Sequence, residues 1–391
     1  MFATPSATEA SYRRQTIMIR DFRKKDIEEV FRTPIVQQTA FWSEVKRRMG
    51  ISSIACNFRV PGSEINGNGS DAVNITSDVL VVLRQIDPHH SIAYVPYGPE
   101  LEPLDEYRGI FLEELSECLR SQLPGDCIMV RYDLAWESFW AREDDAYTPE
   151  GIWLGPPSQQ SQELRFNYGS FHHNLKKAHT NILPSNTIFL DLRKGEESLL
   201  QSMKSKTKYN IGLSQRNGVT VSVAGTEDLS RWYALYTETA RRNGFFLHNI
   251  EHFRALLTST AENSQSPAEV FLLVAEHDNE PLAAMFLVIT GNRGTYLYGA
   301  SSSRKRNLMA TYALQWKAIL LAKERGCTEY DMFGIAPNPD PDHPMYGLYR
   351  FKTGFGGEIY RSMGCWDYPL DRAAYSYFAA TELTSQGYHI T

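Results

Sequence analysis

Two stretches decide the fold: Tyr296-Leu-Tyr298-Gly299-Ala300 and, 201 residues before its second tyrosine, the matching Tyr94-Val-Pro-Tyr97-Gly98-Pro99. Each ends an apolar segment and precedes a helical pattern. Each helical pattern runs to a glycine, Gly125 or Gly326, which lies 28 residues after the tyrosine of the Tyr-Gly pair. Matched spacing over this length indicates that one structural unit is present twice.

The two helical patterns also agree face by face. Their apolar residues recur at i, i+1, i+4, i+7 and i+8, so each pattern predicts a helix that buries one side. The matching positions are Phe111, Leu112, Leu115, Cys118 and Leu119 in the first half and Tyr312, Ala313, Trp316, Ile319 and Leu320 in the second. We expect the glycine after each helix to end it in a left-handed conformation.

Strand-like runs complete both units. The first half has them at Ser53–Arg59, Val79–Ile86, Ser91–Val95 and Cys127–Arg131, and the second at Val270–Glu276, Leu282–Thr290, Thr295–Tyr298 and Glu329–Phe333. Helical patterns precede them at Lys25–Phe31, Val36–Met49, Glu227–Arg242 and Asn249–Leu257. The order α-α-β-β-β-α-β therefore occurs twice. It predicts an α/β protein of two tandem units that resemble the GNAT-type acyltransferase fold, in which the helix after the third strand starts beside the acyl donor.

Other segments are less regular. Pro61–Ser77 has the composition of a long flexible loop, and Phe171–Thr180 that of a short basic helix. The basic turn Arg304–Arg306 precedes Asn307, which could cap the following helix. The last thirty residues are expected to pack back on the first half.

Composition limits the class of protein. The chain has 391 residues, 42% of them hydrophobic and 22% charged, which excludes a disordered or fibrous protein. A net charge of −6 excludes a general nucleic-acid binder, and no DNA partner is expected. Five cysteines lie far apart with no Cys-x-x-Cys pair, which favours a reducing compartment. The longest apolar run, Leu282–Ile289, is far shorter than the ~20 residues of a membrane span. We therefore expect a cytoplasmic protein.

Seven motifs resemble the FemABX family of peptidoglycan aminoacyltransferases, in the order that the family has them. The first three are Phe41-Trp42-Ser-Glu-Val-Lys46, Ala93-Tyr-Val-Pro-Tyr-Gly-Pro99 and Ser202-Met-Lys-Ser-Lys-Thr-Lys-Tyr-Asn-Ile211. The others are Thr239-Ala-Arg-Arg-Asn-Gly-Phe245, Tyr312-Ala-Leu-Gln-Trp316, Tyr330-Asp-Met-Phe-Gly-Ile335 and Gly347-Leu-Tyr-Arg-Phe-Lys-Thr-Gly-Phe-Gly-Gly357. Each motif is weak by itself, but together they cover most of the chain.

The resemblance implies transfer of an amino acid from aminoacyl-tRNA to the stem-peptide amine of a precursor, UDP-MurNAc-pentapeptide or lipid II, without a cofactor. A lipid-linked acceptor would bring a peripheral membrane contact. Some family members carry a helical coiled-coil arm, but the residues between Ile211 and Leu229 leave no room for one, so the chain resembles the armless type. We expect residues 1–186 with 358–391 to bind the precursor and residues 187–357 to form the aminoacyl-tRNA side.

The resemblance also suggests catalytic residues. It places Lys352 at the oxyanion and the tRNA acceptor end, with Phe351 beside the terminal adenosine; the alternative for Lys352 is a surface lysine at a strand end. Asp133, expected just after a strand, resembles an acidic position that could serve as general base. A structural aspartate that caps a turn is an equal alternative, and a substrate carboxylate could supply the base instead.

For substrate binding, the resemblance implies that Lys46 and Arg242 grip the precursor diphosphate, with Trp42 and Tyr298 beside them. Lys46 could equally belong to a solvated basic helix end. Two basic clusters are candidates for tRNA phosphates: Lys204, Lys206 and Lys208, and Arg304, Lys305 and Arg306. No histidine pair has metal-ligand spacing, so no metal site is expected.

Two other functions stay open. One is an acyl-CoA-dependent N-acyltransferase acting on a small amine, although the turn at Arg304–Ala310 lacks the glycines typical of that class. The other is an inactive protein that binds muropeptides.

Overall fold

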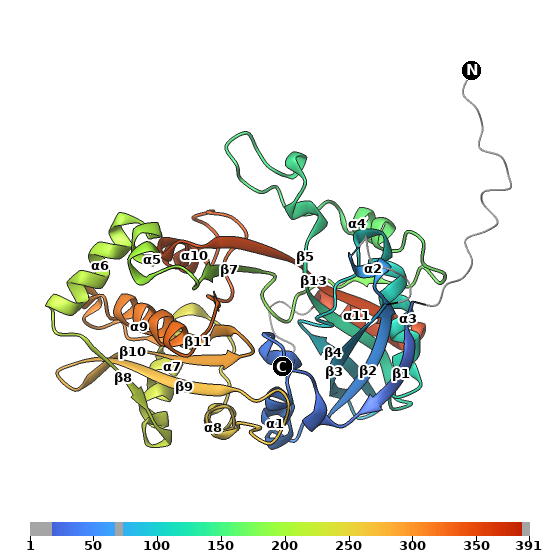
Figure 1. Ribbon diagram of the computed structural model, residues 1–391, viewed down its shortest axis with the longest axis horizontal. Helices are drawn as coiled ribbons and strands as arrows, with labels where there is room; N and C mark the ends of the chain where they lie inside the picture. Colours follow the sequence, from blue (N-terminus) through green and yellow to red (C-terminus); the bar gives the residue numbers. More distant parts are fainter. Residues whose placement is uncertain (1–17, 67–72, 385–391) are drawn as a thin grey trace.

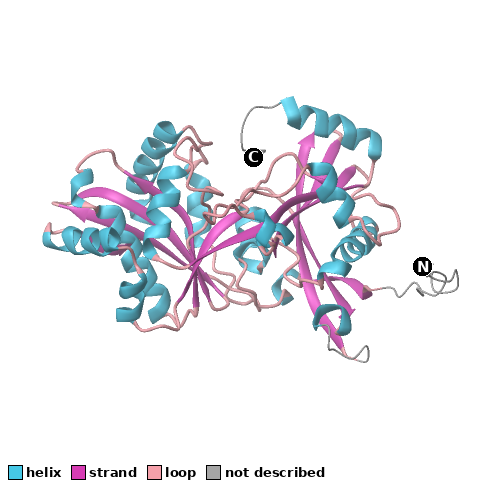
Figure 2. Ribbon diagram, turned by 90° about the horizontal axis from the view of Figure 1, so that it is seen from above, coloured by secondary structure: helices cyan, strands magenta, loops and turns pink. Residues whose placement is uncertain are grey.

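The computed structural model describes residues 18–66 and 73–384, which form two lobes around one sheet (Figure 1). Among the described residues, the strand order along the sheet is β1-β2-β3-β4-β5-β13-β7-β12-β11-β10-β9-β8, with β6 paired to β13. The strands run across both lobes and helices flank them (Figure 2).

The first lobe holds β1 (Arg20–Lys25), β2 (Ser53–Pro61), β3 (Asn74–Asp87), β4 (His90–Pro96), β5 (Cys127–Glu137) and β6 (Lys176–Lys177). The second holds β7 (Asn186–Asp191), β8 (Thr220–Ala224), β9 (Glu269–His277), β10 (Glu280–Thr290), β11 (Arg293–Ser301) and β12 (Glu329–Asp331), and β13 (Glu358–Pro369) returns to the first.

The helices of the first lobe are α1 (Ala40–Arg48), α2 (Ser63–Asn66), α3 (Arg108–Arg120), α4 (Gln159–Phe166) and α11 (Arg372–Thr384). Those of the second are α5 (Glu196–Ser202), α6 (Ser205–Arg216), α7 (Leu229–Asn243), α8 (Ile250–Thr258), α9 (Ala310–Glu324) and α10 (Tyr346–Lys352).

The duplicated unit is present. In each lobe an antiparallel series of four strands, β1–β4 or β8–β11, ends on a parallel pair, β4 with β5 or β11 with β12. Helix α3 connects the first parallel pair and α9 the second. The two lobes are therefore tandem GNAT-like units. Helix α6 is followed almost at once by β8, and no coiled-coil arm lies between them.

Strand β13 joins the two units into one sheet. Its first residues, Glu358–Arg361, pair with β7, and the stretch Ser362–Pro369 pairs with β5. The proposed boundaries between residues 186 and 187 and between 357 and 358 thus fall at the start of β7 and just before β13. With these boundaries, the last strand of the first unit, β13, comes after the whole second unit in the sequence.

Several local predictions were wrong. Lys25–Phe31 is not a helix: Lys25 ends strand β1, and only a single 3₁₀ turn follows at Ile27–Glu29. Phe171–Thr180 is not a helix, and within it only Lys176–Lys177 is regular structure, as strand β6. Gly125 does not end α3, which stops at Arg120. Gly326, by contrast, follows α9 in the left-handed region with φ of 81°.

The predicted loop Pro61–Ser77 is shorter than expected, because α2 and the start of β3 occupy both of its ends. Its central residues, 67–72, lie outside the described residues. Strand β5 is longer than predicted, because Tyr132, Leu134 and Trp136 are all buried and extend it to Glu137. Asp133 therefore lies inside the strand and not in a turn after it.

The two lobes share a hydrophobic cluster. Trp42 and Val45 of α1 belong to the same buried cluster as Trp232 of α7 and Phe253 of α8. Trp232 has no exposed surface, and burial of a side chain of this kind stabilises a fold by a few kcal/mol. This shared core fixes α1 of the first lobe against the second lobe.

Candidate active site

The two parallel strand pairs, β4 with β5 and β11 with β12, differ in how far along the strands the pairing extends. In the first lobe β4 and β5 stay paired from Ser91 with Cys127 to Pro96 with Asp133. In the second lobe β11 and β12 pair only over Arg293–Thr295, although β11 continues to Ser301. The edge of β11 from Tyr296 onward is therefore not paired with β12, and the second lobe alone has an open parallel pair.

Lys352, the last residue of α10, fills the place where these strands part. Its Nζ donates hydrogen bonds to the carbonyl oxygens of Phe333 (3.1 Å) and Gly334 (2.8 Å), which follow β12. The same atom lies 4.9 Å from the centre of the Tyr296 ring, the first residue of β11 beyond the paired region. Lys352 is only 4% exposed. It is a buried residue at a helix end, not a surface lysine at a strand end.

The environment of Lys352 changes the pKa of its ammonium group. Burial lowers the pKa of its ammonium from 10.5 to about 7, and the nearby carboxylate of Asp331 opposes this shift. Asp331 itself accepts hydrogen bonds from the Thr187 hydroxyl and the Phe333 amide. A lysine near its pKa at neutral pH can stabilise developing negative charge and can also exchange a proton.

Aromatic rings connect Lys352 to a pocket. The Phe351 ring packs edge-on against Tyr312, with ring centres 5.1 Å apart, and against Phe355 at 5.2 Å. Tyr312 also lines a pocket of about 440 Å³ at the start of α9. That helix begins after Met309, whose φ is 57° and whose side chain makes no capping hydrogen bond. Asn307 is therefore not the cap, contrary to the prediction.

Four of the six predicted tRNA-binding cations line this pocket: Lys206, Arg304, Lys305 and Arg306. Arg304 and Lys305 form ion pairs with Glu280 at 3.0 and 2.8 Å, and the hydrogen bond with Lys305, together with both positive charges, lowers the pKa of the Glu280 carboxyl. The other two cations, Lys204 and Lys208, do not line the pocket. Lys204 donates a hydrogen bond to Thr353, next to Lys352, and Lys208 is exposed on α6.

Lys46 and its neighbours form a second group, between α1 of the first lobe and β11 of the second. Its Nζ lies 4.7 Å from the Trp42 ring. Burial, together with the charge of Arg84, lowers the pKa of Lys46 to about 8. Within the described part of the chain Lys46 has no carboxylate partner, which makes it available for an anionic ligand. The charge of Lys46 in turn acts on His252, whose Nε2 lies 3.0 Å from the hydroxyl of Tyr298.

Arg242, near the end of helix α7, contacts Ser301, the last residue of strand β11. Its guanidinium donates to the Ser301 carbonyl (2.9 Å) and to the hydroxyls of Ser301 and Ser303 (both 3.1 Å). Since Ser301 and Ser302 line the α9 pocket, Arg242 is held near the rim of that pocket.

Lys352 and Arg242 thus both contact strand β11, and Lys46 is linked to this strand through His252. Lys352 contacts Tyr296, Lys46 lies near the pair of His252 and Tyr298, and Arg242 binds Ser301. The register of β11 against β10 skips Leu297, which marks a β-bulge. Residues two apart on a regular strand share a face. The bulge instead lets Tyr296 pack with the α9 cluster and Tyr298 with the α7–α8 cluster.

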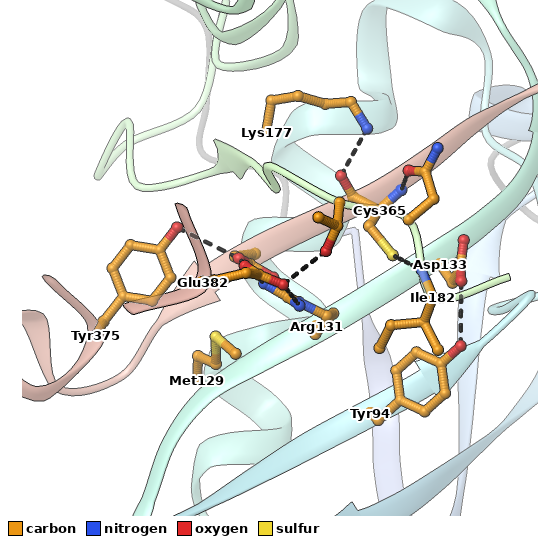
Figure 3. Close-up of polar contacts among 12 residues, drawn as sticks. Tyr94, Met129, Arg131, Asp133, Lys177, Ile182, Cys365, Tyr375 and Glu382 are labelled. Carbon is orange, nitrogen blue, oxygen red and sulfur yellow. Dashed lines mark hydrogen bonds and ion pairs between the residues drawn. The ribbon is translucent and has the colours of Figure 1, made fainter. Parts of the chain in front are cut away.

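Asp133 has a different environment. Its carboxylate has no exposed surface and accepts a hydrogen bond from the Tyr94 hydroxyl (3.1 Å), as Figure 3 shows. It also accepts one from the Leu183 amide (2.7 Å). Burial raises its pKa to about 6. These contacts attach the segment before β7 to the first lobe. They favour the structural alternative, and the role of general base stays a prediction.

Sequence reasoning missed two residues of the site, Tyr296 and His252. Tyr296 stands in the stretch that decides the fold, but its place under Lys352 depends on the bulge at Leu297. His252 is one histidine in an apolar helix, and no sequence pattern connects it to Tyr298.

Among the described residues no helix is long and apolar enough to cross a membrane, and no group of three or more acidic, histidine or cysteine side chains is arranged to hold a metal ion.

An open parallel strand pair holding a buried lysine, in the second of two tandem GNAT-like units, is an arrangement suited to acyl transfer. The family model described as "FemAB family" matches residues 165–266 and 258–382, more than half of the chain. The chain therefore belongs to the FemAB family.

Two relatives come from staphylococci. The chain is 24% identical over 274 residues to "Lipid II:glycine glycyltransferase" of Staphylococcus haemolyticus, covering 54% of this chain and 64% of the relative. It is 25% identical over 271 residues to the protein of the same name from Staphylococcus saprophyticus, with coverage of 54% and 64%. The chain thus spans just under two thirds of the length of these relatives.

A solved structure shares the fold. The crystal structure of FemX superposes with a TM-score of 0.66 at 17% sequence identity, over 91% of this chain and all of that one. This similarity extends over both lobes and supports the tandem arrangement.

Proposed function

We propose that this protein transfers an amino acid from aminoacyl-tRNA to the stem-peptide amine of a peptidoglycan precursor. The observation that carries the proposal is the buried Lys352 at the open strand pair of a FemAB-family chain. The names of the staphylococcal relatives support a glycyl or similar aminoacyl group and a lipid II-type acceptor.

The chemistry needs little from the protein besides positioning and charge. The donor is an activated ester, so the acceptor amine attacks its carbonyl carbon directly, and the ribose hydroxyl leaves from the tetrahedral intermediate. In this proposal the Lys352 ammonium stabilises the oxyanion. The proton lost by the amine balances the proton gained by the leaving ribose oxygen, and a pKa near 7 suits Lys352 to carry it. No covalent enzyme intermediate is required.

The binding roles are assigned from the cations of α1 and α7 and from those around the α9 pocket. Lys46, which has no carboxylate partner among the described residues, would take the precursor diphosphate, with Arg242 as the second cation and Trp42 and Tyr298 beside them. The cations around the α9 pocket, with Lys204 and Lys208, would hold tRNA phosphates near Phe351. Phe351 would pack against the terminal adenosine.

The test is transfer of a labelled amino acid from a panel of charged tRNAs to UDP-MurNAc-pentapeptide and, separately, to lipid II in vesicles. The wild-type protein should label at least one acceptor. Lys352→Met should lose at least about a hundredfold in turnover, as expected when one electrostatic contact to the transition state is removed. Lys317→Met is the matched control, because Lys317 is an exposed lysine of α9 that does not line the pocket.

Other outcomes favour other functions. Full activity of Lys352→Met would contradict the role of Lys352. Tight binding of acetyl-CoA, with acyl transfer to a small amine and none from tRNA, would indicate the CoA-dependent alternative. Precursor binding with no turnover from any charged tRNA would indicate a muropeptide-binding protein.

A further inference from the structure

His252 is a buried titratable residue to which the proposed chemistry gives no role. It lies in the first turn of α8, and only 1% of its surface is exposed. Its ring bridges the two lobes. Nδ1 lies 3.1 Å from the Met49 sulfur at the end of α1, and Nε2 lies 3.0 Å from the Tyr298 hydroxyl oxygen on β11.

These two partners determine which ring nitrogen carries the proton. A thioether sulfur can accept a hydrogen bond but cannot donate one. Nδ1 must therefore carry the proton, because an unprotonated nitrogen at this distance would be a second acceptor, and its lone pair would be repelled by those of the sulfur. In a neutral imidazole Nε2 is then an acceptor, so the Tyr298 hydroxyl donates to it. Burial, with the charges of His248 and Lys46, lowers the pKa of His252 to about 2, which keeps the ring neutral.

We propose that His252 is a positioning residue that accepts a hydrogen bond from the Tyr298 hydroxyl. Because this hydroxyl has only one proton to donate, Tyr298 can then interact with the acceptor substrate only as a hydrogen-bond acceptor. Tyr298 would then bind a neutral N–H or O–H group, such as a peptide amide or a sugar hydroxyl. It would repel phosphate and carboxylate oxygens, which can only accept. This inference rests on the proposed function for the identity of the ligand, but not for the tautomer.

The surroundings divide the recognition of the substrate between two side chains. The Lys46 ammonium, three residues before Met49, offers positive charge to an anion. Tyr298 offers lone pairs to a donor. The His248 ring stacks on His252, with ring centres 4.6 Å apart and planes 19° from parallel, and so covers the other side of the imidazole. Because Met49 comes from the first lobe, the tautomer of His252 depends on contact between the lobes.

The tautomer can be measured without substrate, by nitrogen NMR of the full-length protein labelled with ¹⁵N-histidine. His252→Gln identifies the signal by its disappearance. We expect a neutral ring with the proton on Nδ1 throughout the range from pH 5 to pH 9. A ring protonated on Nε2, or an imidazolium at pH 7, would overturn the inference.

The effect on the substrate is measured by calorimetric binding of UDP-MurNAc-pentapeptide to a double-mutant cycle of His252→Phe and Tyr298→Phe. Each single variant should bind about five- to tenfold more weakly, as expected for loss of one hydrogen bond. The double variant should bind no more weakly than Tyr298→Phe, since His252 acts through the Tyr298 hydroxyl. Additive losses would show that His252 acts in some other way, and would overturn the proposal.

Two further variants separate positioning from packing. His252→Gln supplies an amide oxygen that can accept the Tyr298 proton, and it should recover most of the affinity that His252→Phe loses. Tyr233→Phe removes a hydroxyl from the same aromatic cluster, and it should bind like the wild type. Calorimetric binding of UDP-MurNAc without its peptide shows whether the group that donates a hydrogen bond to Tyr298 belongs to the peptide or to the nucleotide sugar. If the wild type binds no precursor at all, the proposed function fails, while the NMR experiment still decides the tautomer.

Discussion

The charge of Lys352 is the property of the site that can be tested most directly. We predict that its ammonium titrates near pH 7, because the loss of hydration on burial penalises the charged form more than Asp331 stabilises it. A pKa difference of one unit corresponds to about 1.4 kcal/mol. The change from 10.5 to about 7 thus corresponds to about 5 kcal/mol of destabilisation by the buried charge.

This difference has a definite sign in the pH dependence of stability. The folded-state pKa lies below the unfolded-state value, so between about pH 7 and pH 10.5 the unfolded chain binds more protons at this residue. The free energy of unfolding contributed by Lys352 must therefore rise with pH in that range, by up to about 1.4 kcal/mol per pH unit. Below pH 7 the residue is charged in both states, and its contribution is constant.

Two measurements test the prediction. In the first, NMR of protein with ¹³C-labelled lysine follows the Lys352 side chain, identified by its absence in Lys352→Met, and should show a midpoint near pH 7. In the second, urea unfolding compares the two proteins from pH 6 to pH 10. The wild type should gain stability relative to Lys352→Met as the pH rises, since the two proteins differ only in the titratable group at position 352. A midpoint above pH 9, or a stability difference that does not change with pH, would refute the reasoning.

Three further predictions concern other charges. Precursor binding should raise the lowered pKa of Lys46, because a bound anion favours the charged ammonium. Calorimetry at pH 8 in buffers of different ionisation enthalpy should therefore detect proton uptake on binding. Proton release would contradict an anion at this site. Asp133→Asn should keep turnover within a few-fold of the wild type, because the carboxylate is buried and held by Tyr94 and Leu183, whereas a loss above about a hundredfold would support the role of general base. Arg131→Met should destabilise the fold by about 3–5 kcal/mol in urea unfolding, because the buried carboxylates of Asp367 and Glu382 lose the guanidinium that they share; Figure 3 shows Arg131 beside Glu382. A difference below about 1 kcal/mol would mean that these carboxylates are not buried charges.

The sequence predicted most of the fold because the same pattern occurs twice, and each copy supports the interpretation of the other. Two strands that it missed, β1 and β8, are the two edges of the sheet. Edge strands are paired on one side only and tolerate charged and polar residues. In β1 the run Arg-Asp-Phe-Arg-Lys-Lys therefore has no apolar alternation to detect. Strand β5 was cut short for a related reason, since burial on both faces removes the alternation that marks a half-buried strand.

The site could be predicted only in part. The family motif identifies Lys352, but the carbonyl groups that surround it come from residues after β12, where Phe333 adopts φ of 59°. Nothing in the sequence predicts this backbone conformation. Met49, His252 and Tyr298 come from three elements far apart in the chain, and only the packing of the two lobes brings them together. Local patterns therefore identify single residues, while the charges and tautomers of the site arise from tertiary contacts.

The route of β13 has a consequence for how the protein is made. The first unit needs β13 to complete its sheet, yet this strand is translated only after the whole second unit. The usual order, in which the N-terminal domain folds first during synthesis, is therefore not available to this chain. We expect residues 187–357 to fold on the ribosome while the first unit waits for its last strand. A nascent chain stopped before residue 358 would then hold the later-encoded unit folded and the earlier one incomplete.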